Sequence, residues 1–322
     1  MTYGEKVRIL RGKLILSQSE MADMLGVTFA TVNRWENGKH EPSIKQKRAT
    51  AYDNWDPAIE VYKRNFDHPI IKKDLFDADS ASDIAKHKPE IIIGGPPCQD
   101  FSSAGFRNED YGRAVLSLVY SKIVAAIGTD YFVMENVPEI FKSKTYQLVE
   151  ANFRENGYKL TKIVLDASFF GVPQKRKRAF TIGSKLDEDD FLKDALLSGK
   201  AKKPMTVFDY LGHGLGVDYY FRVPRSYQRR GVFSIYEPSP TIRGVDRPIP
   251  RGYKTRPNDP APIEQVRVLT PKERSLIQTF PETFEFFGSK SDQNQMIGNA
   301  VPVNLAKYVA ATLLEYLCSK RR

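Results

Sequence analysis

The stretch Glu90-Ile91-Ile92-Ile93-Gly94-Gly95-Pro96-Pro97-Cys98-Gln99 predicts a buried strand that ends in a stiff loop. Consecutive β-branched residues closed by glycine are typical of a parallel strand that is covered on both faces. Ligand-binding loops of such sheets follow the carboxyl ends of the strands, and Pro96 and Pro97 restrict the backbone just before Cys98. A lone cysteine is usually an inert core residue. Its place after a strand end, before a polar run, favours a functional role here.

Similar apolar runs alternate with helical patterns along the middle of the chain. Strands are predicted at residues 131–134, 160–166 and 178–183, and helices at 114–126 and 146–155. This alternation predicts an α/β fold with a doubly wound sheet. Glu135 follows the strand at 131–134, so neighbouring parallel strands would place Cys98 and Glu135 at one sheet edge. A thiol beside a carboxyl suits covalent catalysis with acid assistance, although Glu135 alone is more typical of a solvated strand end.

The first 50 residues have a different, helical pattern. Ser17 and Glu20 form a predicted capping box, Gly26 permits a tight turn, and Thr28 can cap a second helix that runs to about residue 37. The segment resembles phage-repressor-type helix-turn-helix domains. By that resemblance, the residues facing a DNA groove are Thr28, Phe29, Thr31, Asn33 and Arg34. The alternative is a helical hairpin used only for packing or protein contact.

Composition limits the classes of protein that this chain can belong to. The 322 residues carry a formal net charge of +10, which indicates a polyanionic partner such as nucleic acid. Basic residues gather in 175–178 and again in 222–251, where arginines alternate with aromatic residues. Two cysteines and four scattered histidines predict neither a disulfide framework nor a metal site. No apolar run is long enough to span a membrane, so a cytoplasmic protein is the default expectation.

Several short segments, in order, resemble the signature motifs of cytosine-5 DNA methyltransferases. They are Gly95-Pro96-Pro97-Cys98-Gln99, Glu135-Asn136-Val137, Gln174-Lys175-Arg176-Lys177-Arg178 and Gly298-Asn299-Ala300-Val301-Pro302. Residues 267–281 resemble the helix that leads into the last motif, and Pro240-Thr241-Ile242-Arg243 resembles the end of a target recognition domain. The resemblance covers residues 51–317 and implies an S-adenosylmethionine-dependent methyltransferase sheet with a small, irregular recognition domain.

The resemblance also implies roles for individual residues. Cys98 would attack C6 of a flipped-out cytosine, Glu135 would hold or protonate N3, and the basic strand would assist. The implied catalytic residues are Cys98, Glu135, Arg176 and Arg178, the two arginines pointing the same way. The implied DNA contacts outside the helix-turn-helix are Gln99, Ser102, Arg229, Arg230, Thr241 and Arg243. Pro96 and Asn299 would line the pocket of the cofactor, S-adenosyl-L-methionine.

One expected unit is missing. The family normally begins with a strand, a glycine-rich turn of the pattern Asp-Leu-Phe-x-Gly-x-Gly-Gly and a helix, which together cradle the methionine end of the cofactor. This chain passes instead into residues 51–58, which resemble the second motif and offer Asp53 or Asn54 for the ribose and Trp55 for the adenine. Asp74 would meet the adenine amino group. The glycines of 209–216 are interpreted as a loop, because no helical pattern follows them.

Three explanations of the missing unit stay open. A second polypeptide carrying the glycine-rich motif supplies it, the chain is a degenerate product, or the first 50 residues fill the gap. We favour a split enzyme, because removal of a central strand exposes strand edges and apolar faces.

The predicted division is a helix-turn-helix in 1–50, a catalytic domain in 51–184, a target recognition domain in 185–266 and a return to the catalytic domain in 267–322. The predicted function is methylation of duplex DNA, with no membrane partner, in a restriction-modification system. The alternatives are a helix-turn-helix transcriptional regulator with a vestigial methyltransferase part, and an enzyme acting on RNA.

Overall fold

The computed structural model of the protein describes residues 2–13, 16–25, 27–39, 49–97, 115–224 and 229–320. Two compact units can be distinguished. The first comprises Met1–Ala49 with Tyr316–Arg322, and the second comprises Thr50–Glu315.

The first unit contains three helices, α1 (Tyr3–Lys13), α2 (Gln18–Leu25) and α3 (Phe29–Glu36). The predicted capping box is present, because Ser17 N donates to Glu20 Oε2 at 2.6 Å and Glu20 N donates to Ser17 Oγ at 3.1 Å. Thr28 caps α3 as expected and accepts from Thr31 N. An apolar cluster that includes Val32 and Trp35 forms a small core. The two short helices around a turn agree with the predicted helix-turn-helix.

The described strands of the second unit form four sheets, two of which are built only from residues 51–184. One is the parallel pair β1 (Ala51–Asp53) and β2 (Ile70–Lys72). The other has the order β3-β4-β7-β5, with bounds Ile91–Gly94, Tyr131–Asn136, Lys177–Ser184 and Lys159–Asp166. Strands β3 and β4 are parallel neighbours, whereas β7 is antiparallel to both β4 and β5. The parallel pair β3–β4 is the arrangement that the sequence predicted for the two apolar runs.

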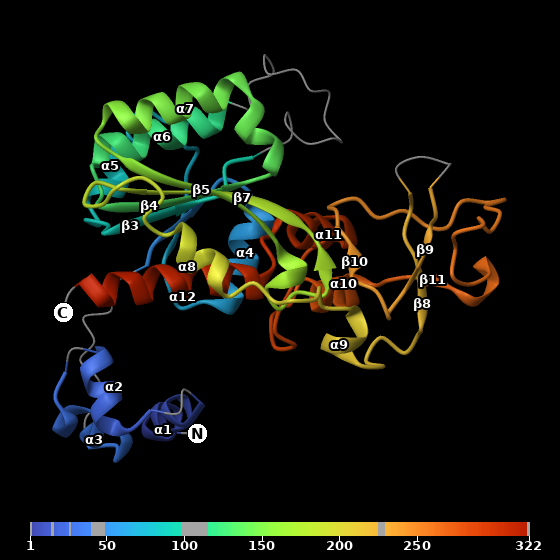
Figure 1. Ribbon diagram of the computed structural model, residues 1–322, viewed down its shortest axis with the longest axis horizontal. Helices are drawn as coiled ribbons and strands as arrows, with labels where there is room; N and C mark the ends of the chain where they lie inside the picture. Colours follow the sequence, from blue (N-terminus) through green and yellow to red (C-terminus); the bar gives the residue numbers. More distant parts are fainter. Residues whose placement is uncertain are drawn as a thin grey trace. The chain divides into compact units, whose positions relative to one another are not determined.

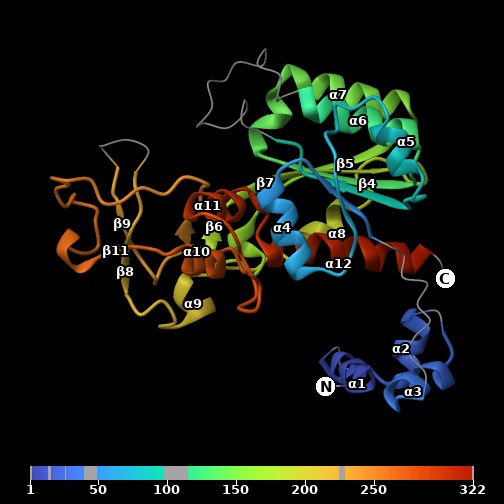
Figure 2. The ribbon, with the colours of Figure 1, turned by 180° about the vertical axis from the view of Figure 1, so that it is seen from behind.

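Helices cover both sides of these strands. Figures 1 and 2 show α6 (Val115–Ile127) and α7 (Lys144–Glu155) on one side, and α4 (Asp56–Asn65) and α12 (Val303–Lys320) on the other. The shorter helices α5 (Ser80–Ala85) and α8 (Lys193–Ser198) complete the layers. A hydrophobic core lies between β4 and the α6–α7 layer, where Phe132 and Phe153 stack at 4.0 Å between ring centroids.

The prediction that β3 is a buried strand is wrong. Its neighbour β4 is almost fully buried, but Ile91 and Ile92 in β3 are only partly buried and Ile93 is 72% exposed. The reason is that β3 pairs only with β4 among the described strands, so one of its edges is open.

The remaining elements lie at one end of the second unit. A three-stranded sheet of order β11-β8-β9 joins Arg267–Val268, Tyr219–Phe221 and Val232–Ser234. The short strand β10 (Ser239–Pro240) pairs with β6 (Gln174–Lys175), and so ties this end of the unit to the start of β7. The helices here are α9 (Val207–Leu211), α10 (Pro271–Ile277) and α11 (Lys290–Asn299). The prediction that residues 209–216 form a loop is confirmed only from Gly212 onward, because 209–211 are the last turn of α9, which the capping box at Thr206 begins.

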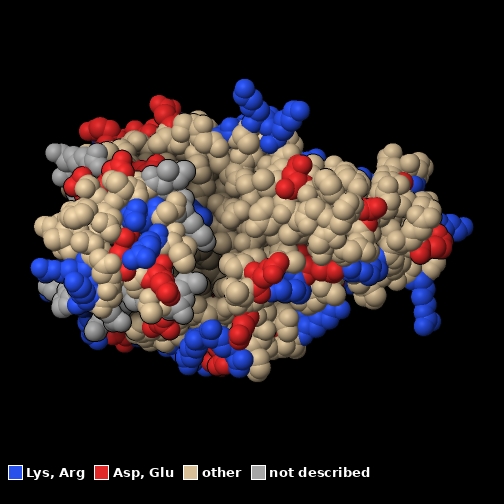
Figure 3. Space-filling model, turned by 90° about the horizontal axis from the view of Figure 1, so that it is seen from below, with Lys and Arg blue, Asp and Glu red and all other residues tan. Residues whose placement is uncertain are grey.

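The surface is mixed in charge on the face that Figure 3 shows. Lys and Arg side chains are interspersed there with Asp and Glu, around a broad uncharged area. None of the helices in the described ranges is both long enough and apolar enough to cross a lipid bilayer.

Candidate active site

Glu135 lies at the carboxyl end of β4, next to the loop that follows β3. Its Oε1 is 2.6 Å from Nε of Arg178, and the two side chains are only 16% and 12% exposed. A Cβ atom on Gly95 would lie 3.2 Å from Oε2 of Glu135. Asn136 Nδ2 donates to Pro96 O at 3.2 Å, which fastens the loop after β3 to the end of β4. The sequence prediction that these two strand ends meet is therefore confirmed up to Pro97, the last described residue before Cys98.

Burial and neighbouring charge act on Glu135 in opposite directions. Desolvation raises the pKa of this carboxyl, while the cations of Arg178 and Arg176 lower it, and desolvation prevails. A Glu whose pKa is raised holds a proton more readily than an exposed Glu. The site can therefore donate a proton from Glu135 while Arg178 orients the carboxyl group.

Arg176 does not share the position of Arg178, and the prediction that the two point the same way is wrong. Arg176 is 1% exposed, and its guanidinium donates to the carbonyl oxygens of Ile242 at 2.7 Å, Gly298 at 2.7 Å and Ala300 at 2.9 Å. Arg176 lies between β6 and β7 rather than within one strand, so the alternation of a regular strand does not apply. Its contacts make it a positioning residue that joins distant segments beside the site.

The buried contacts of Arg176 with residues 242, 298 and 300 form a junction between distant segments. Two glutamines to which the sequence assigned no role extend this junction. Gln174 is fully buried, its Nε2 donates to Gln278 Oε1 at 2.7 Å, and its Oε1 accepts from Ile242 N at 2.7 Å. Gln278 Nε2 in turn donates to Ile297 O at 2.5 Å. Gln174 opens the segment 174–178 that resembles a family motif, but the sequence assigned it no role of its own. Nothing local in the sequence identifies a partner 104 residues away.

The predicted contacts of the recognition region are divided between this junction and the surface. Thr241 Oγ1 donates to Lys175 O at 2.8 Å, and Arg243 Nη2 donates to Val223 O at 2.6 Å. Arg230 forms an ion pair with Glu237 and lies over the Phe233 ring, 4.5 Å from its centroid. Arg229 is exposed.

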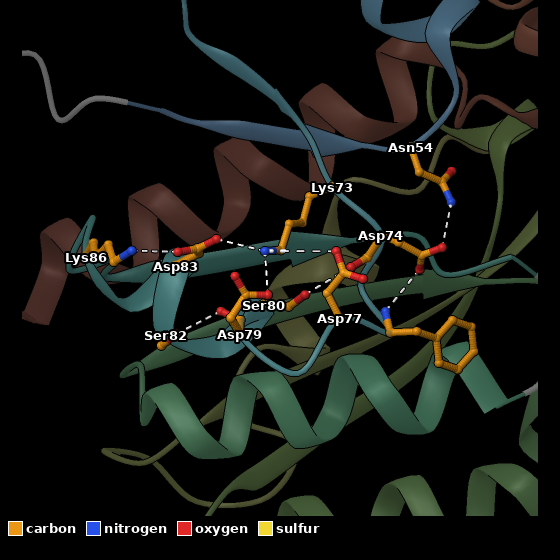
Figure 4. A network of polar contacts seen from close by, with 10 residues as sticks. Asn54, Lys73, Asp74, Asp77, Asp79, Ser80, Ser82, Asp83 and Lys86 are labelled. Atoms are coloured by element: carbon orange, nitrogen blue, oxygen red, sulfur yellow. Dashed lines mark hydrogen bonds and ion pairs between the residues drawn. The ribbon is translucent and has the colours of Figure 1, made fainter.

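The candidate cofactor residues gather at the carboxyl ends of β1 and β2. Asn54 Nδ2 donates to Asp74 Oδ2 at 3.4 Å, so the residues that follow β1 and β2 lie next to each other (Figure 4). Asp53 Oδ1 accepts from Trp55 N at 2.8 Å and so shapes the turn into α4. The Asp53 carboxylate is therefore engaged with the backbone of Trp55, whereas Asn54 and Asp74 are exposed.

A charged network holds the loop that carries Asp74. Lys73 Nζ is 2.6 Å from Asp79 Oδ1 and 2.8 Å from Asp83 Oδ2 (Figure 4). The hydrogen bonds from Lys73 and Lys86 lower the pKa of Asp83 to about 2. Ser80 Oγ donates to Asp74 O at 3.0 Å. These contacts fix the direction in which the loop leaves β2.

The other predicted residues are distributed as follows. Asn299 ends α11, is exposed, and accepts from Gln295 Nε2 at 2.9 Å. In the first unit, Thr28 and Arg34 are exposed while Thr31 and Asn33 are half-buried. Cys98, Gln99 and Ser102 lie outside the described residues.

Comparison with known proteins bears on both units. The family described as C-5 cytosine-specific DNA methylase matches residues 42–214 and 216–315, and a helix-turn-helix family matches residues 7–46. Type II methyltransferase M.HgiDI of Herpetosiphon aurantiacus is 53% identical over 272 residues, which are 84% of this chain and 88% of that protein. Type II methyltransferase M.HindV of Haemophilus influenzae is 53% identical over 269 residues, 83% of this chain and 88% of its own length.

Solved structures resemble the fold at lower identity. The Entamoeba histolytica methyltransferase EhMeth has a TM-score of 0.61 at 17% identity, over 85% of this chain and 90% of that one. The S. pombe Dnmt2 methyltransferase has a TM-score of 0.60 at 18% identity, over 83% and 90% of the two chains. The second unit therefore has an α/β methyltransferase fold.

Proposed function

Because the chain belongs to the C-5 cytosine-specific DNA methylase family, we propose that it transfers a methyl group to C5 of a flipped-out cytosine in a specific duplex DNA sequence. The type II methyltransferases M.HgiDI and M.HindV, each 53% identical to it, support a place in a restriction-modification system. The observation that carries the chemistry is the buried contact between Glu135 and Arg178, 2.6 Å long, directly beside the loop that leads into Cys98.

The proposed mechanism assigns each step to a residue of this chain. A cytosine must leave the duplex before its ring atoms can be reached. The Cys98 thiolate bonds to C6 while the protonated Glu135 donates to N3, so that the negative charge develops at C5. Arg178 holds the Glu135 carboxyl in place. After methylation, the C5 proton leaves to water as the C6–S bond breaks, and N3 returns its proton to the Glu135 carboxylate. These steps restore the aromatic ring, the Cys98 thiolate and the protonated Glu135.

The cofactor proposed is S-adenosyl-L-methionine, which supplies the methyl group as an electrophile when it is bound. The residues at the ends of β1 and β2 fit its adenosine end. Asn54 and Asp74 are exposed and adjacent, and their amide and carboxylate oxygens are suitable acceptors for ribose hydroxyls and an adenine amino group. Trp55, at the start of α4, can offer an apolar ring face to the base. Pro96 and Asn299 are proposed to line the same pocket.

The methionine end of the cofactor has no such support in this chain. The glycine-rich unit that opens this family is missing from the sequence, and β1–β2 and β3-β4-β7-β5 form separate sheets. We therefore propose a split enzyme in which a second polypeptide carries the glycine-rich turn. Tight one-to-one binding of the cofactor to the purified chain alone, measured by calorimetry, would contradict this.

The proposed DNA contacts lie in both units. Arg229, Gln99 and Ser102 would contact the target duplex. Arg230, Thr241 and Arg243 would shape the recognition surface through their protein contacts. In the first unit, exposed Arg34 and the residues at the start of α3 would enter a major groove.

The decisive experiment uses DNA in which 5-fluorocytosine replaces the target cytosine. Fluorine at C5 cannot leave as a proton does, so the covalent link from Cys98 to C6 should persist. The chain, together with a polypeptide that supplies the glycine-rich unit, should give a cofactor-dependent complex that survives denaturation. Cys98→Ser should abolish the complex and Cys318→Ser, which changes an exposed cysteine, should keep it. A complex that persists with Cys98→Ser refutes the proposal.

A second candidate function is transcriptional regulation by the first unit, which has its own core and a well-capped α3. Under this hypothesis the methyltransferase part is vestigial. Cys98→Ser should leave operator binding unchanged in either case. Protection of plasmid DNA from restriction by the wild type decides whether methylation occurs as well.

A further inference from the structure

A small hollow lies beside residues 243–246, in the proposed target recognition domain. Its volume is about 20 Å³, which admits one group of the size of a water molecule or a methyl group. Its apolar lining includes Val223, Ile242, Val245 and Leu269, and Asp246 and Arg274 form a charged side. Because Val245 is 60% exposed, the hollow opens to solvent at this side chain.

The backbone is fastened on both sides of Val245 by one buried arginine. Arg274 is 5% exposed, and its Nη2 donates to the carbonyl oxygen of Arg243. Its Nη1 lies 3.6 Å from Oδ2 of Asp246 and donates to Asn294 Oδ1 at 2.5 Å. The residues before and after Val245 are therefore tied to α10, which carries Arg274, and through it to α11.

Two further contacts restrict the same segment. Arg243 Nη2 donates to Val223 O at 2.6 Å, which joins the segment to the residues that follow β8. Gly244 packs so closely on α11 that a Cβ atom on it would lie 2.5 Å from Gln295 Oε1. Val245 is thus an apolar side chain that a closely held backbone presents to solvent.

The charge around the hollow favours a nucleic acid as the occupant. Residues 219–256 contain nine Lys and Arg residues but two Asp and Glu residues. Of these two carboxylates, Asp246 faces Arg274 and Glu237 pairs with Arg230, so both are balanced within the protein. The C5-methyl of thymine is the apolar group that a base pair shows in the major groove, and apolar side chains bind it there. An exposed valine on a basic surface suits this group.

We propose that Val245 and the hollow beside it bind the 5-methyl group of a thymine in the target sequence, from the major groove. This rests on the proposed function, because it requires that the second unit recognises duplex DNA in order to methylate it. Arg274 and Asp246 are positioning residues, since they hold the backbone beside Val245 and contact no base. The target sequence therefore contains a thymine at a fixed distance from the methylated cytosine.

The test compares two DNA substrates that differ only in this methyl group. DNA copied with deoxyuridine in place of thymidine keeps every base pair, but its uracils lack the 5-methyl group. The full chain, together with the polypeptide that supplies the glycine-rich unit, should methylate both. The kcat/KM on thymine DNA should be about tenfold higher than on uracil DNA, because a missing methyl group in an apolar pocket weakens recognition by about that factor.

Three variants locate the effect. Val245→Ala should reduce the thymine-to-uracil ratio to about twofold or less, because the contact with the methyl group is lost. The matched control is Val164→Ala on β5, where a valine is 41% exposed outside the recognition region, and this variant should keep the ratio. Arg274→Met should also lower the ratio, whereas a loss of stability alone would lower both rates equally and leave the ratio unchanged.

Each outcome has a defined consequence. Equal kcat/KM of the wild type on the two DNAs overturns the proposal and leaves the proposed function intact. A ratio that Val245→Ala does not change overturns the assignment to Val245, because the methyl group is then bound elsewhere. A ratio that Arg274→Met does not change overturns the positioning role of Arg274. Methyl transfer to neither DNA refutes the proposed function and, with it, the role of Val245.

Discussion

Replacement of Arg176 by methionine tests how the active-site strand is joined to the distant segments of the second unit. The guanidinium donates three hydrogen bonds of 2.7–2.9 Å to carbonyl oxygens while 1% exposed. Methionine fills a similar volume but donates none of them. Ala300 O keeps a contact of 3.3 Å with Gln278 Nε2, whereas Ile242 O and Gly298 O lose the Arg176 donor.

The expected loss of stability follows from these contacts. Each buried carbonyl that loses its donor costs about 1–3 kcal/mol. The relief of burying a charge offsets part of the total. Two such carbonyls cost about 4 kcal/mol, and with the offset we expect the free energy of unfolding to fall by about 3 kcal/mol. The urea midpoint should then fall by about 1 M for a slope near 3 kcal/mol per M.

The assay is urea unfolding of the full chain, followed by circular dichroism. The matched control is Arg154→Met. The Arg154 guanidinium likewise makes polar contacts, in ion pairs with Glu150 at 3.1 Å and Asp189 at 3.0 Å, but its side chain is 40% exposed. Exposed pairs contribute less than about 1 kcal/mol. If Arg176→Met lowers the free energy of unfolding no more than Arg154→Met does, the interpretation of Arg176 as a buried junction is refuted.

Three further changes probe the site. Glu135→Gln should lower the methylation rate about a hundredfold or more, since an amide does not donate an acidic proton to N3; a rate near that of the wild type would exclude Glu135 as the acid. In the wild type, the rate should fall as pH rises through the raised pKa of Glu135, because the protonated form is the donor. Arg178→Met removes a cation that lowers this pKa, so the fall should move to higher pH, and a shift to lower pH would contradict the assigned electrostatics. Gly298→Ala should lower the free energy of unfolding by about 3 kcal/mol, because the added Cβ would lie 2.0 Å from Gly244 N. Unchanged urea unfolding would show that the backbone moves apart here at little cost in free energy.

Much of the second unit could be predicted from local patterns. The parallel neighbours β3 and β4 follow from two apolar runs that each end in a polar loop, and the meeting of Glu135 with the segment before Cys98 follows from that pairing. These predictions succeed because strand periodicity and the polar residues at strand ends each depend on only a few consecutive residues.

Other features could not be read locally. Arg176 and Arg178 are alike in sequence, yet one binds three carbonyl groups and the other binds Glu135. The partners of Gln174 lie far along the chain, so no local pattern identifies them.

The sequence by itself determined the family, the order of the motifs and the absence of the glycine-rich unit, because each depends on residue types at short spacings. Only the tertiary structure decided what that absence means for β3. The same isoleucines that predict a buried strand stand beside an open edge, and Ile93 is exposed. Burial depends on what packs against a residue as well as on its own hydrophobicity, and that neighbour is set by the topology of the whole sheet.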